Sequence, residues 1–189
     1  GKENMAFWMT FVTFGLAIMY RKDRKSSIIL LGFSVASFCY FLLVLKVFMP
    51  AFSLKGSYDH FAFHSLGESM SGAFMHLFSH PIDSLGTFFT NHLSDPFFDG
   101  LKVESHIILL ISGVAILFRK PVYLLMLVPI YFQKFFHDQP MVWSTGAQYS
   151  IEFAPILAIG VFEIIRSIKQ EKYQKYALIG TAILSIGCT

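Results

Sequence analysis

Charged residues are scarce in this chain. Asp, Glu, Lys and Arg make up 14% of its 189 residues, and hydrophobic residues make up 54%. Soluble domains carry roughly 25% charged residues, so this chain lacks the polar surface that a soluble globule needs. The same composition argues against a disordered segment and a nucleic-acid-binding domain. It predicts an integral membrane protein.

Cysteines are few, and recognisable catalytic motifs are missing. Both cysteines, Cys39 and Cys188, lie inside apolar runs, a pattern that argues against a secreted disulfide scaffold. The chain has no Gly-rich phosphate loop, no nucleophile elbow and no CxxC pair. The composition therefore defines a class of protein but not a reaction.

Long apolar runs are what the chain does contain. A helix needs about 20 residues to cross a bilayer, and continuous rather than alternating runs favour helices over a barrel. We expect an all-α, polytopic fold with about six transmembrane helices, the last one truncated, in a single membrane domain that is part of a longer chain. The runs are Met5–Tyr20, Ile28–Met49, Leu101–Phe118, Val122–Phe136, Gln148–Ile165 and a sixth that starts at Tyr176.

Basic residues concentrate in three short connections between these runs. Residues 21–25, 119–120 and 166–175 together hold ten of the 15 basic residues. The positive-inside rule places such loops in the cytoplasm, so the long segment 50–101 is predicted to lie outside. All seven histidines fall on this outer side, and the basic loops contain none.

The outer segment is expected to contain helices, because a structureless loop of about 50 residues would be unusual. Leu66–His80 has an amphipathic pattern, and Pro81 is placed to end it and to start a second helix. Ile82, Leu85 and Phe89 give that second helix an apolar stripe. Such helices suit the membrane interface or the roof of an outer cavity. The alternative is that they only pack on the ends of the spans.

Two histidine pairs have a spacing that metal sites use. His60 and His64, and likewise His76 and His80, are four residues apart, which places both rings on one face of a helix, as zinc and other divalent metals prefer. A third ligand is also needed, and the nearby acidic residues are Asp59 and Glu68. The alternative is that these histidines line a cavity or the interface and bind no metal.

Polar residues near the outer ends of the spans are candidate binding residues. Glu152 lies about one turn inside the fifth span, where a carboxylate is costly unless it faces protein or water. The alternative is that Glu152 is neutral or paired with Lys134 or Lys46. Lys102, at the outer end of the third span, is a candidate to hold a lipid phosphate or only snorkels towards the interface.

Two further pairs of polar residues open spans. Gln148 and Tyr149 lie one turn before Glu152. Glu3 and Asn4 begin the first span, where an acidic residue also suits the helix N-terminus electrostatically.

Short motifs in a fixed order carry a family resemblance. They are Lys2–Ala6, Arg21–Lys25, Val47–Pro50, Tyr58 with His60, Leu66–Ser69, His80–Pro81, Lys102, Arg119–Pro121 and Gln148–Pro155. In this order they resemble an uncharacterised bacterial family of predicted membrane proteins that is grouped with the glycosyltransferase C (GT-C) superfamily. The resemblance covers nearly the whole chain and is greatest to the version found in Bacteroidetes-type bacteria.

The resemblance implies a multi-pass protein of the bacterial inner membrane that works on its periplasmic side. GT-C enzymes transfer a sugar from a polyprenyl-phosphate carrier to an acceptor, and their acidic catalytic motif lies in a first outer loop that this chain does not include. The resemblance thus implies no catalytic base here. It implies part of a cavity for the lipid-linked sugar, with a divalent metal as a candidate cofactor. The substrate-binding candidates are Glu3, Asn4, His60, Lys102, Gln148, Tyr149 and Glu152.

Three functions follow from these patterns. A GT-C-like transferase would gather the candidate residues around one outer cavity. A non-catalytic scaffold subunit would instead bind protein partners along its spans. A transporter would need polar residues in the middle of several spans, where this chain is almost wholly apolar. Membrane lipid is an expected partner in each case, and nucleic acid is not.

Overall fold

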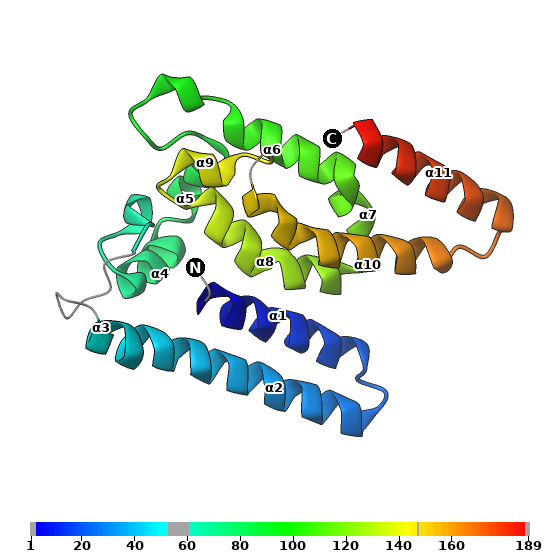
Figure 1. Ribbon diagram of the computed structural model, residues 1–189, viewed down its shortest axis with the longest axis horizontal. Helices are drawn as coiled ribbons and strands as arrows, with labels where there is room; N and C mark the ends of the chain where they lie inside the picture. Colours follow the sequence, from blue (N-terminus) through cyan, green and yellow to red (C-terminus); the bar gives the residue numbers. More distant parts are fainter. Residues whose placement is uncertain (1–2, 53–60, 147, 188–189) are drawn as a thin grey trace.

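The computed structural model describes residues 3–52, 61–146 and 148–187, and within these ranges every regular element is a helix. The long helices run side by side, and the short helices α4 (Met70–Ser79), α5 (Pro81–Phe89) and α9 (Pro140–Trp143) gather at one end (Figure 1). This arrangement confirms the all-α class that the apolar runs predict.

The first two predicted spans form a helical hairpin. Helix α1 (Glu3–Met19) is joined to α2 (Arg24–Leu43) by the basic turn, where the Asp23 side chain accepts a hydrogen bond from the Ser26 backbone N–H. Across the hairpin, the Ser34 hydroxyl donates to the Thr10 carbonyl oxygen at 2.9 Å. Small hydroxyl residues of this kind let membrane helices approach closely and bond to each other.

The regular α-helical hydrogen bonding of α2 ends at Leu43, but the helical chain does not stop there. It continues through the wider turn η1 (Val44–Phe48) into α3 (Met49–Phe52). A wider turn of this kind shifts the side chains that follow it around the helix axis, and such turns are frequent at functional sites. Lys46 lies within η1.

The third predicted span is bent at a glycine. Helix α6 (Leu101–Leu109) continues through η4 (Leu110–Val114) into α7 (Ala115–Leu117), and Gly113 inside η4 has a φ of 134°. Side-chain-bearing residues rarely adopt this φ. A Cβ on Gly113 would also lie 2.7 Å from Val161 Cγ2, so the bend and the approach of the neighbouring helix both depend on glycine.

Helix α8 (Pro121–Phe135) is the centre of the bundle, packed against α1 and against α10 (Ala154–Arg166), while α11 (Glu171–Gly187) follows α10 in the chain. The predicted fourth span, Val122–Phe136, agrees with α8 to one residue at each end. The largest buried apolar side chains of this core include Leu117, Leu127, Phe135 and Phe153.

The outer segment contains two short helices, but the first is shorter than expected. The prediction that the helix spans Leu66–His80 is wrong at its start. Gly67 has a φ of 145°, which is not helical, and α4 begins at Met70. Ser69 then caps α4 by accepting a hydrogen bond from the Gly72 N–H at 3.1 Å. Pro81 begins α5 as predicted.

Both short helices expose apolar side chains. Phe78 of α4 is 80% exposed and Ile82 of α5 is 83% exposed. Solvent-facing aromatic and branched side chains in adjacent helices form the kind of apolar surface that marks a membrane or protein contact. This surface favours the interface location over packing on the span ends, which stays a prediction.

Two helical stretches among the described residues are long and apolar enough to cross a bilayer, Arg24–Phe52 and Pro96–Leu117. Only 11% of the most apolar part of the first is buried within the protein, so it presents apolar side chains almost all round. Asn4–Met19 and Pro121–Phe135 are apolar but shorter. Two of the expected spans therefore meet the length criterion.

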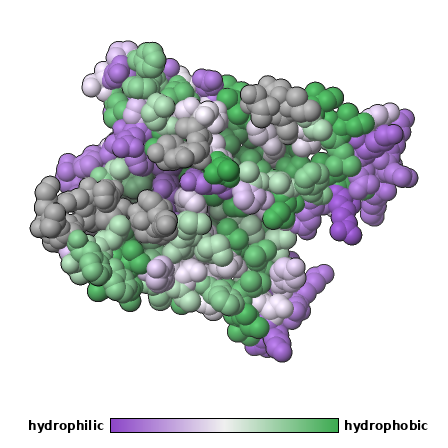
Figure 2. All heavy atoms as spheres, viewed as in Figure 1, coloured by the Kyte–Doolittle hydropathy of each residue, from purple (hydrophilic) through white to green (hydrophobic). Residues whose placement is uncertain are grey.

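The basic turns lie together at one end of the bundle. The connections at 21–24, 119–120 and 167–170 are at the end opposite α4, α5 and α9 (Figure 1). Two hydrophilic projections at that end are separated from the other end by a largely apolar surface (Figure 2). The fold thus has the two-ended distribution of charge that the sequence predicts.

Candidate functional site

A pocket opens at the end of the bundle where the outer segment lies. It has a volume of about 530 Å³ and is bounded by α1, by α2 with η1, by α8 and by the segment that leads into α4. We call it the outer pocket. Its lining residues are Asn4, Phe7, Phe38, Phe41, Leu42, Leu45, Lys46, Phe63, Ser69, Ser71, Phe74, Pro129, Phe132 and Gln133.

The outer pocket combines aromatic walls with a few polar groups. Phe7 and Phe41 stack with ring centroids 4.9 Å apart. Asn4, Lys46 and Gln133 supply the polar edge, and the Gln133 side-chain oxygen accepts a hydrogen bond from Trp8 Nε1 at 2.9 Å. That bond leaves the Gln133 amide group as a donor. An amphiphile with an apolar chain and an anionic or hydroxylated head matches these surroundings.

A second cluster, whose residues do not line the pocket, is built around Trp143 at the end of α9. The Trp143 side chain is fully buried, and its Nε1 donates to the His137 carbonyl oxygen at 2.7 Å. The Lys102 ammonium lies 4.4 Å from the centre of the indole ring, within the range of a cation–π contact. The Ser105 hydroxyl donates to the Trp143 carbonyl oxygen. We call this the lysine–tryptophan cluster.

Lys134 of α8 fixes the loop on the other side of Trp143. Its ammonium donates to the Val142 carbonyl oxygen at 2.7 Å, to the Ser144 carbonyl oxygen at 2.8 Å and to the Ser150 hydroxyl at 3.0 Å. Three N–H groups thus meet three oxygens, which satisfies the full donor capacity of a lysine. This pattern explains how a side chain that is 2% exposed carries a charge.

Lys102 is as fully buried as Lys134. It is 1% exposed and donates to the Thr87 carbonyl oxygen and to His92 Nδ1, the latter at 2.8 Å. These partners and the Trp143 ring already surround the ammonium. The phosphate-binding role predicted for Lys102 would require it to leave them.

An acidic residue joins the outer segment to this cluster. Asp138, which follows α8, accepts hydrogen bonds from the backbone N–H of His64 and has an oxygen 2.7 Å from His64 Nδ1. Its own N–H donates to the Ala62 carbonyl oxygen at 2.8 Å. The Asp138 carboxylate also lies 3.8 Å from His92 Nε2. Asp138 therefore holds residues 62–64 against the segment that leads into α9, which ends at Trp143.

His92 is neutral in this arrangement. Its Nδ1 accepts from Lys102, so its proton is assigned to Nε2, which is buried and has no hydrogen-bond partner in the described part of the chain. Burial, reinforced by the nearby Lys102 charge, lowers the pKa of His92 to about 4. His92 therefore takes up a proton at a lower pH in the native protein than in the unfolded chain, in which a histidine titrates near pH 6.5.

Acidification is expected to destabilise the protein through His92. Between about pH 6.5 and pH 4 the unfolded chain binds a proton that the native state does not, so the free energy of unfolding falls as the pH falls, by at most about 3 kcal/mol. Thermal melting of the full-length protein from pH 7 to pH 4.5 measures the effect. His92→Gln keeps an acceptor for Lys102 but cannot titrate. Identical pH slopes for wild type and variant would contradict the assignment.

The structure brings together only some of the residues that the sequence singles out. Asn4 lines the outer pocket, whereas Lys102 belongs to the lysine–tryptophan cluster. Glu152, in the turn η5 (Gln148–Phe153), is half-buried near Lys134, whose hydrogen bonds go to other groups. His60 lies outside the described residues, as do the side chains of Glu3, Gln148 and Tyr149.

The histidine pairs do not assemble a metal site in the described residues. His76 and His80 stack with centroids 4.8 Å apart, while His64 bonds to Asp138. No group of three His, Cys, Asp or Glu side chains in residues 3–52, 61–146 and 148–187 has a suitable geometry. The pairing of His60 with His64 is not described.

The sequence patterns do not predict two of the residues that this region uses, Asp138 and Lys46. Asp138 is a single acidic residue in a short loop, and the sequence suggests Lys46 only as an alternative partner for Glu152. Lys46 had one usable signal, because a lysine within an apolar span marks a functional position by default. Asp138 had none, since its partners are 46 to 76 positions away in the sequence.

The chain matches one family over nearly its whole length. Residues 4–189 match the family described as "Predicted membrane protein (DUF2079)", so the chain belongs to this family. No curated protein and no solved structure matches it. Membership agrees with the apolar composition and with the exposed apolar surface of α2.

Proposed function

We propose that this chain is the part of a multi-pass bacterial inner-membrane protein that receives a lipid-linked sugar at its outer face. The outer pocket is the site, and the polyprenyl-phosphate carrier is the ligand class. In this account the six apolar runs are spans, the three basic turns are cytoplasmic, and α4 and α5 lie at the periplasmic interface.

The observation that carries the proposal is the composition of the outer pocket. Its walls come from aromatic and aliphatic side chains of α1, α2 and α8, which suit an isoprenoid chain. Lys46 is an exposed cation at the same pocket, and a lysine ammonium is a frequent partner of phosphate oxygens. Asn4 and the Gln133 amide group are placed to bond to hydroxyl groups of a sugar.

The resemblance to GT-C enzymes supplies the reaction. The proposed activity is transfer of the sugar from the lipid phosphate to a hydroxyl acceptor on the periplasmic side. Glu152, the outer histidines and a divalent metal remain proposed contributors to substrate binding, together with the candidate residues whose side chains are not described.

Binding of a short carrier analogue tests the proposal. The full-length protein, purified in nanodiscs, is titrated with farnesyl phosphate and with farnesol, its uncharged counterpart, and the complexes are counted by native mass spectrometry. We expect farnesyl phosphate to bind at least tenfold more tightly. Lys46→Gln should weaken the binding of farnesyl phosphate about tenfold, because one charge-assisted hydrogen bond contributes about 1.5 kcal/mol.

Lys22→Gln is the matched control, because Lys22 lies in the basic turn at the opposite end. It should leave farnesyl phosphate binding unchanged. Equal binding of farnesyl phosphate and farnesol, or equal losses in the two variants, would overturn the proposal.

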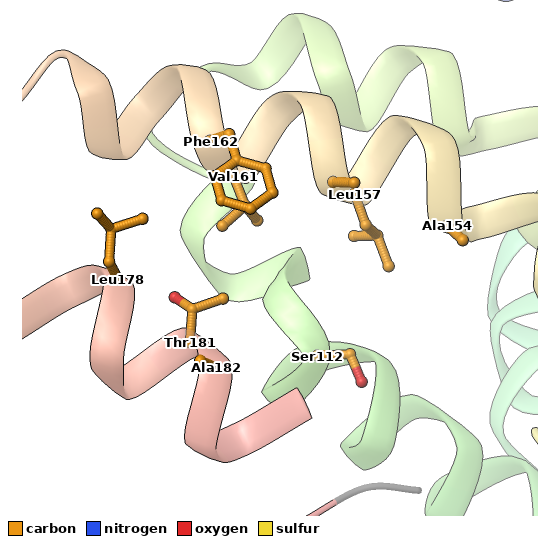
Figure 3. A pocket seen from close by; sticks show the side chains of 9 residues that line it. Ser112, Ala154, Leu157, Val161, Phe162, Leu178, Thr181 and Ala182 are labelled. Atoms are coloured by element: carbon orange, nitrogen blue, oxygen red, sulfur yellow. The ribbon is translucent and has the colours of Figure 1, made fainter. Parts of the chain in front are cut away.

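A scaffold role is the second candidate, and one groove favours it. Side chains of α10 and α11 face each other across this groove, with Ser112 of η4 at its edge (Figure 3). It has a volume of about 540 Å³, and small residues such as Ala154, Ala158 and Ala182 contribute to it. Small residues allow a further membrane helix to approach closely.

The two candidates predict different effects of filling this groove. Ala158→Leu should leave farnesyl phosphate binding unchanged if the chain is a transferase. It should reduce the size of the assembly on native gels if the groove holds a helix of a partner subunit.

A further inference from the structure

The segment that leads into α4, together with the start of α4, supplies one wall of the outer pocket. The pocket is lined from this side by Phe63, Ser69, Ser71 and Phe74. The Phe63 ring is half-buried, and its centroid lies 5.8 Å from that of Phe132, which lines the pocket from α8. The position of Phe63 therefore contributes directly to the shape of the pocket.

Asp138 is bonded to both neighbours of Phe63. The Asp138 backbone N–H donates to the Ala62 carbonyl oxygen at 2.8 Å. The Asp138 carboxylate accepts from the His64 backbone N–H at 3.0 Å, and a carboxylate oxygen lies 2.7 Å from His64 Nδ1. In the described part of the chain, every hydrogen bond between residues 61–64 and a residue beyond 67 involves Asp138. One residue thus holds Phe63 from both sides.

Apolar packing alone holds the ring of Phe63 less firmly. The nearest fully buried side chain of this segment is Leu66, which is 1% exposed and packs with Ala73 and Phe136. Leu66 anchors the chain three residues after Phe63, close to the start of α4. Hydrophobic contact has no preferred direction, so hydrogen bonds to the backbone on both sides of Phe63 are what fix its position.

Asp138 also connects this wall to the wall that α8 supplies. It lies three residues beyond the end of α8, the helix that contributes Pro129, Phe132 and Gln133 to the pocket. The hydrogen bond to Asp138 raises the pKa of His64, so the imidazole favours the charged form, in which this bond is stronger. Two walls of the pocket are therefore joined through one carboxylate.

We propose that Asp138 is a positioning residue for ligand binding: by bonding to Ala62 and His64, it holds Phe63 in place as a wall of the outer pocket. The inference rests on the proposed function and adds to it a residue that does not itself touch the ligand. A wall that is already ordered spares the ligand the free energy of ordering it. Without the carboxylate, the isoprenoid chain must also order residues 61–64, and its affinity falls.

A double-mutant cycle tests whether Asp138 acts through Phe63. The full-length protein in nanodiscs is titrated with farnesyl phosphate, and complexes are counted by native mass spectrometry. Asp138→Ala and Phe63→Ala should each weaken binding about tenfold. In the Phe63→Ala background, Asp138→Ala should change binding less than about twofold, because residues that act together are not additive. A carboxylate that only stabilises the fold would weaken binding equally in both backgrounds.

Two controls accompany the cycle. Phe7 lines the pocket from α1 and stacks on Phe41, so Asp138→Ala should still weaken binding about tenfold when Phe7 is alanine. Asp83 is an exposed carboxylate of α5 that does not line the pocket. Asp83→Ala should leave farnesyl phosphate binding unchanged.

A conservative variant covers loss of folding. Asp138→Asn keeps an acceptor oxygen for the His64 N–H but loses the charge. It should weaken farnesyl phosphate binding less than Asp138→Ala does, and this loss should also disappear in the Phe63→Ala background. If Asp138→Ala does not fold, the cycle is run with Asp138→Asn.

Hydrogen exchange gives a readout without ligand. Exchange of the peptide that covers residues 61–67, followed by mass spectrometry in nanodiscs, should be at least about tenfold faster in Asp138→Ala than in the wild type, since the His64 N–H loses its acceptor. Asp83→Ala should exchange at the wild-type rate. Unchanged exchange in Asp138→Ala would show that Asp138 does not hold this segment.

The outcomes separate the inference from the proposed function. If the wild type binds farnesyl phosphate more tightly than farnesol, but the loss caused by the Asp138 variant is the same with and without Phe63, the inference is overturned and the proposed function stands. If the wild type binds no farnesyl phosphate, both are overturned.

Discussion

Replacing Lys134 by methionine is expected to destabilise the protein by about 3–5 kcal/mol. Methionine fills a similar volume without a donor, so packing is largely kept. The three oxygens that the ammonium serves, on Val142, Ser144 and Ser150, remain in place. The Ser144 carbonyl oxygen keeps the Ser150 hydroxyl as a donor at 3.2 Å, whereas the Val142 carbonyl oxygen loses the ammonium. A hydrogen bond to a charged group contributes about 1.5–3 kcal/mol, and a buried acceptor left without a partner costs about 1–3 kcal/mol. Replacing both members of a buried ion pair by apolar residues is sometimes neutral. Here the partners of the ammonium include backbone carbonyl oxygens, which no substitution removes.

Detergent titration of the full-length protein, followed by far-ultraviolet circular dichroism, measures this loss. Lys175→Met is the matched control, since Lys175 is exposed on α11; it should shift the transition by less than about 0.5 kcal/mol. If Lys134→Met behaves like the control, Lys134 does not carry the structural role assigned to it.

Trp143→Ala is expected to have a comparable effect, about 3–5 kcal/mol. The indole is completely buried, and removing a buried aromatic side chain leaves a cavity as well as the lost transfer free energy. The change also removes the hydrogen bond to the His137 carbonyl oxygen and the ring beside the Lys102 ammonium. Lys102 would then remain buried with fewer partners.

Trp143→Phe separates these contributions. Phenylalanine keeps an aromatic ring near Lys102 but has no N–H, so the expected loss is about 1–2 kcal/mol. The same detergent titration serves for both variants. Equal losses for alanine and phenylalanine would show that the hydrogen bond, rather than packing and the cation–π contact, dominates.

The sequence predicts the helical class and the position of α8 well, because apolar length and basic turns are local signals. It does not predict the bend at Gly113, since nothing local distinguishes this glycine from others in the chain. The φ of 134° and the close approach of Val161 are features of the packed structure. The first outer helix starts later than predicted, because the amphipathic pattern continues through Gly67, whose backbone has a non-helical φ of 145°.

The candidate site was predictable only in part. Lys102 is a candidate because of its place at the outer end of the third predicted span, but its partners Thr87, His92 and Trp143 lie 10 to 41 positions away. Contacts of that range depend on tertiary packing, and no spacing rule encodes them. Asn4, a candidate from its place at the outer start of the first predicted span, lines the outer pocket, and its role in substrate binding stays a prediction.

Photo-crosslinking locates the lipid most directly. Farnesyl phosphate carrying a diazirine in its isoprenoid chain is irradiated with the full-length protein in nanodiscs, and labelled peptides are identified by mass spectrometry. We expect labelling at Phe38–Leu45 and at Phe132, two walls of the outer pocket, and loss of this labelling when unlabelled farnesyl phosphate is added. Labelling spread along the exposed face of α2, for example at Ile29 and Phe33, without competition by farnesyl phosphate, would contradict the account.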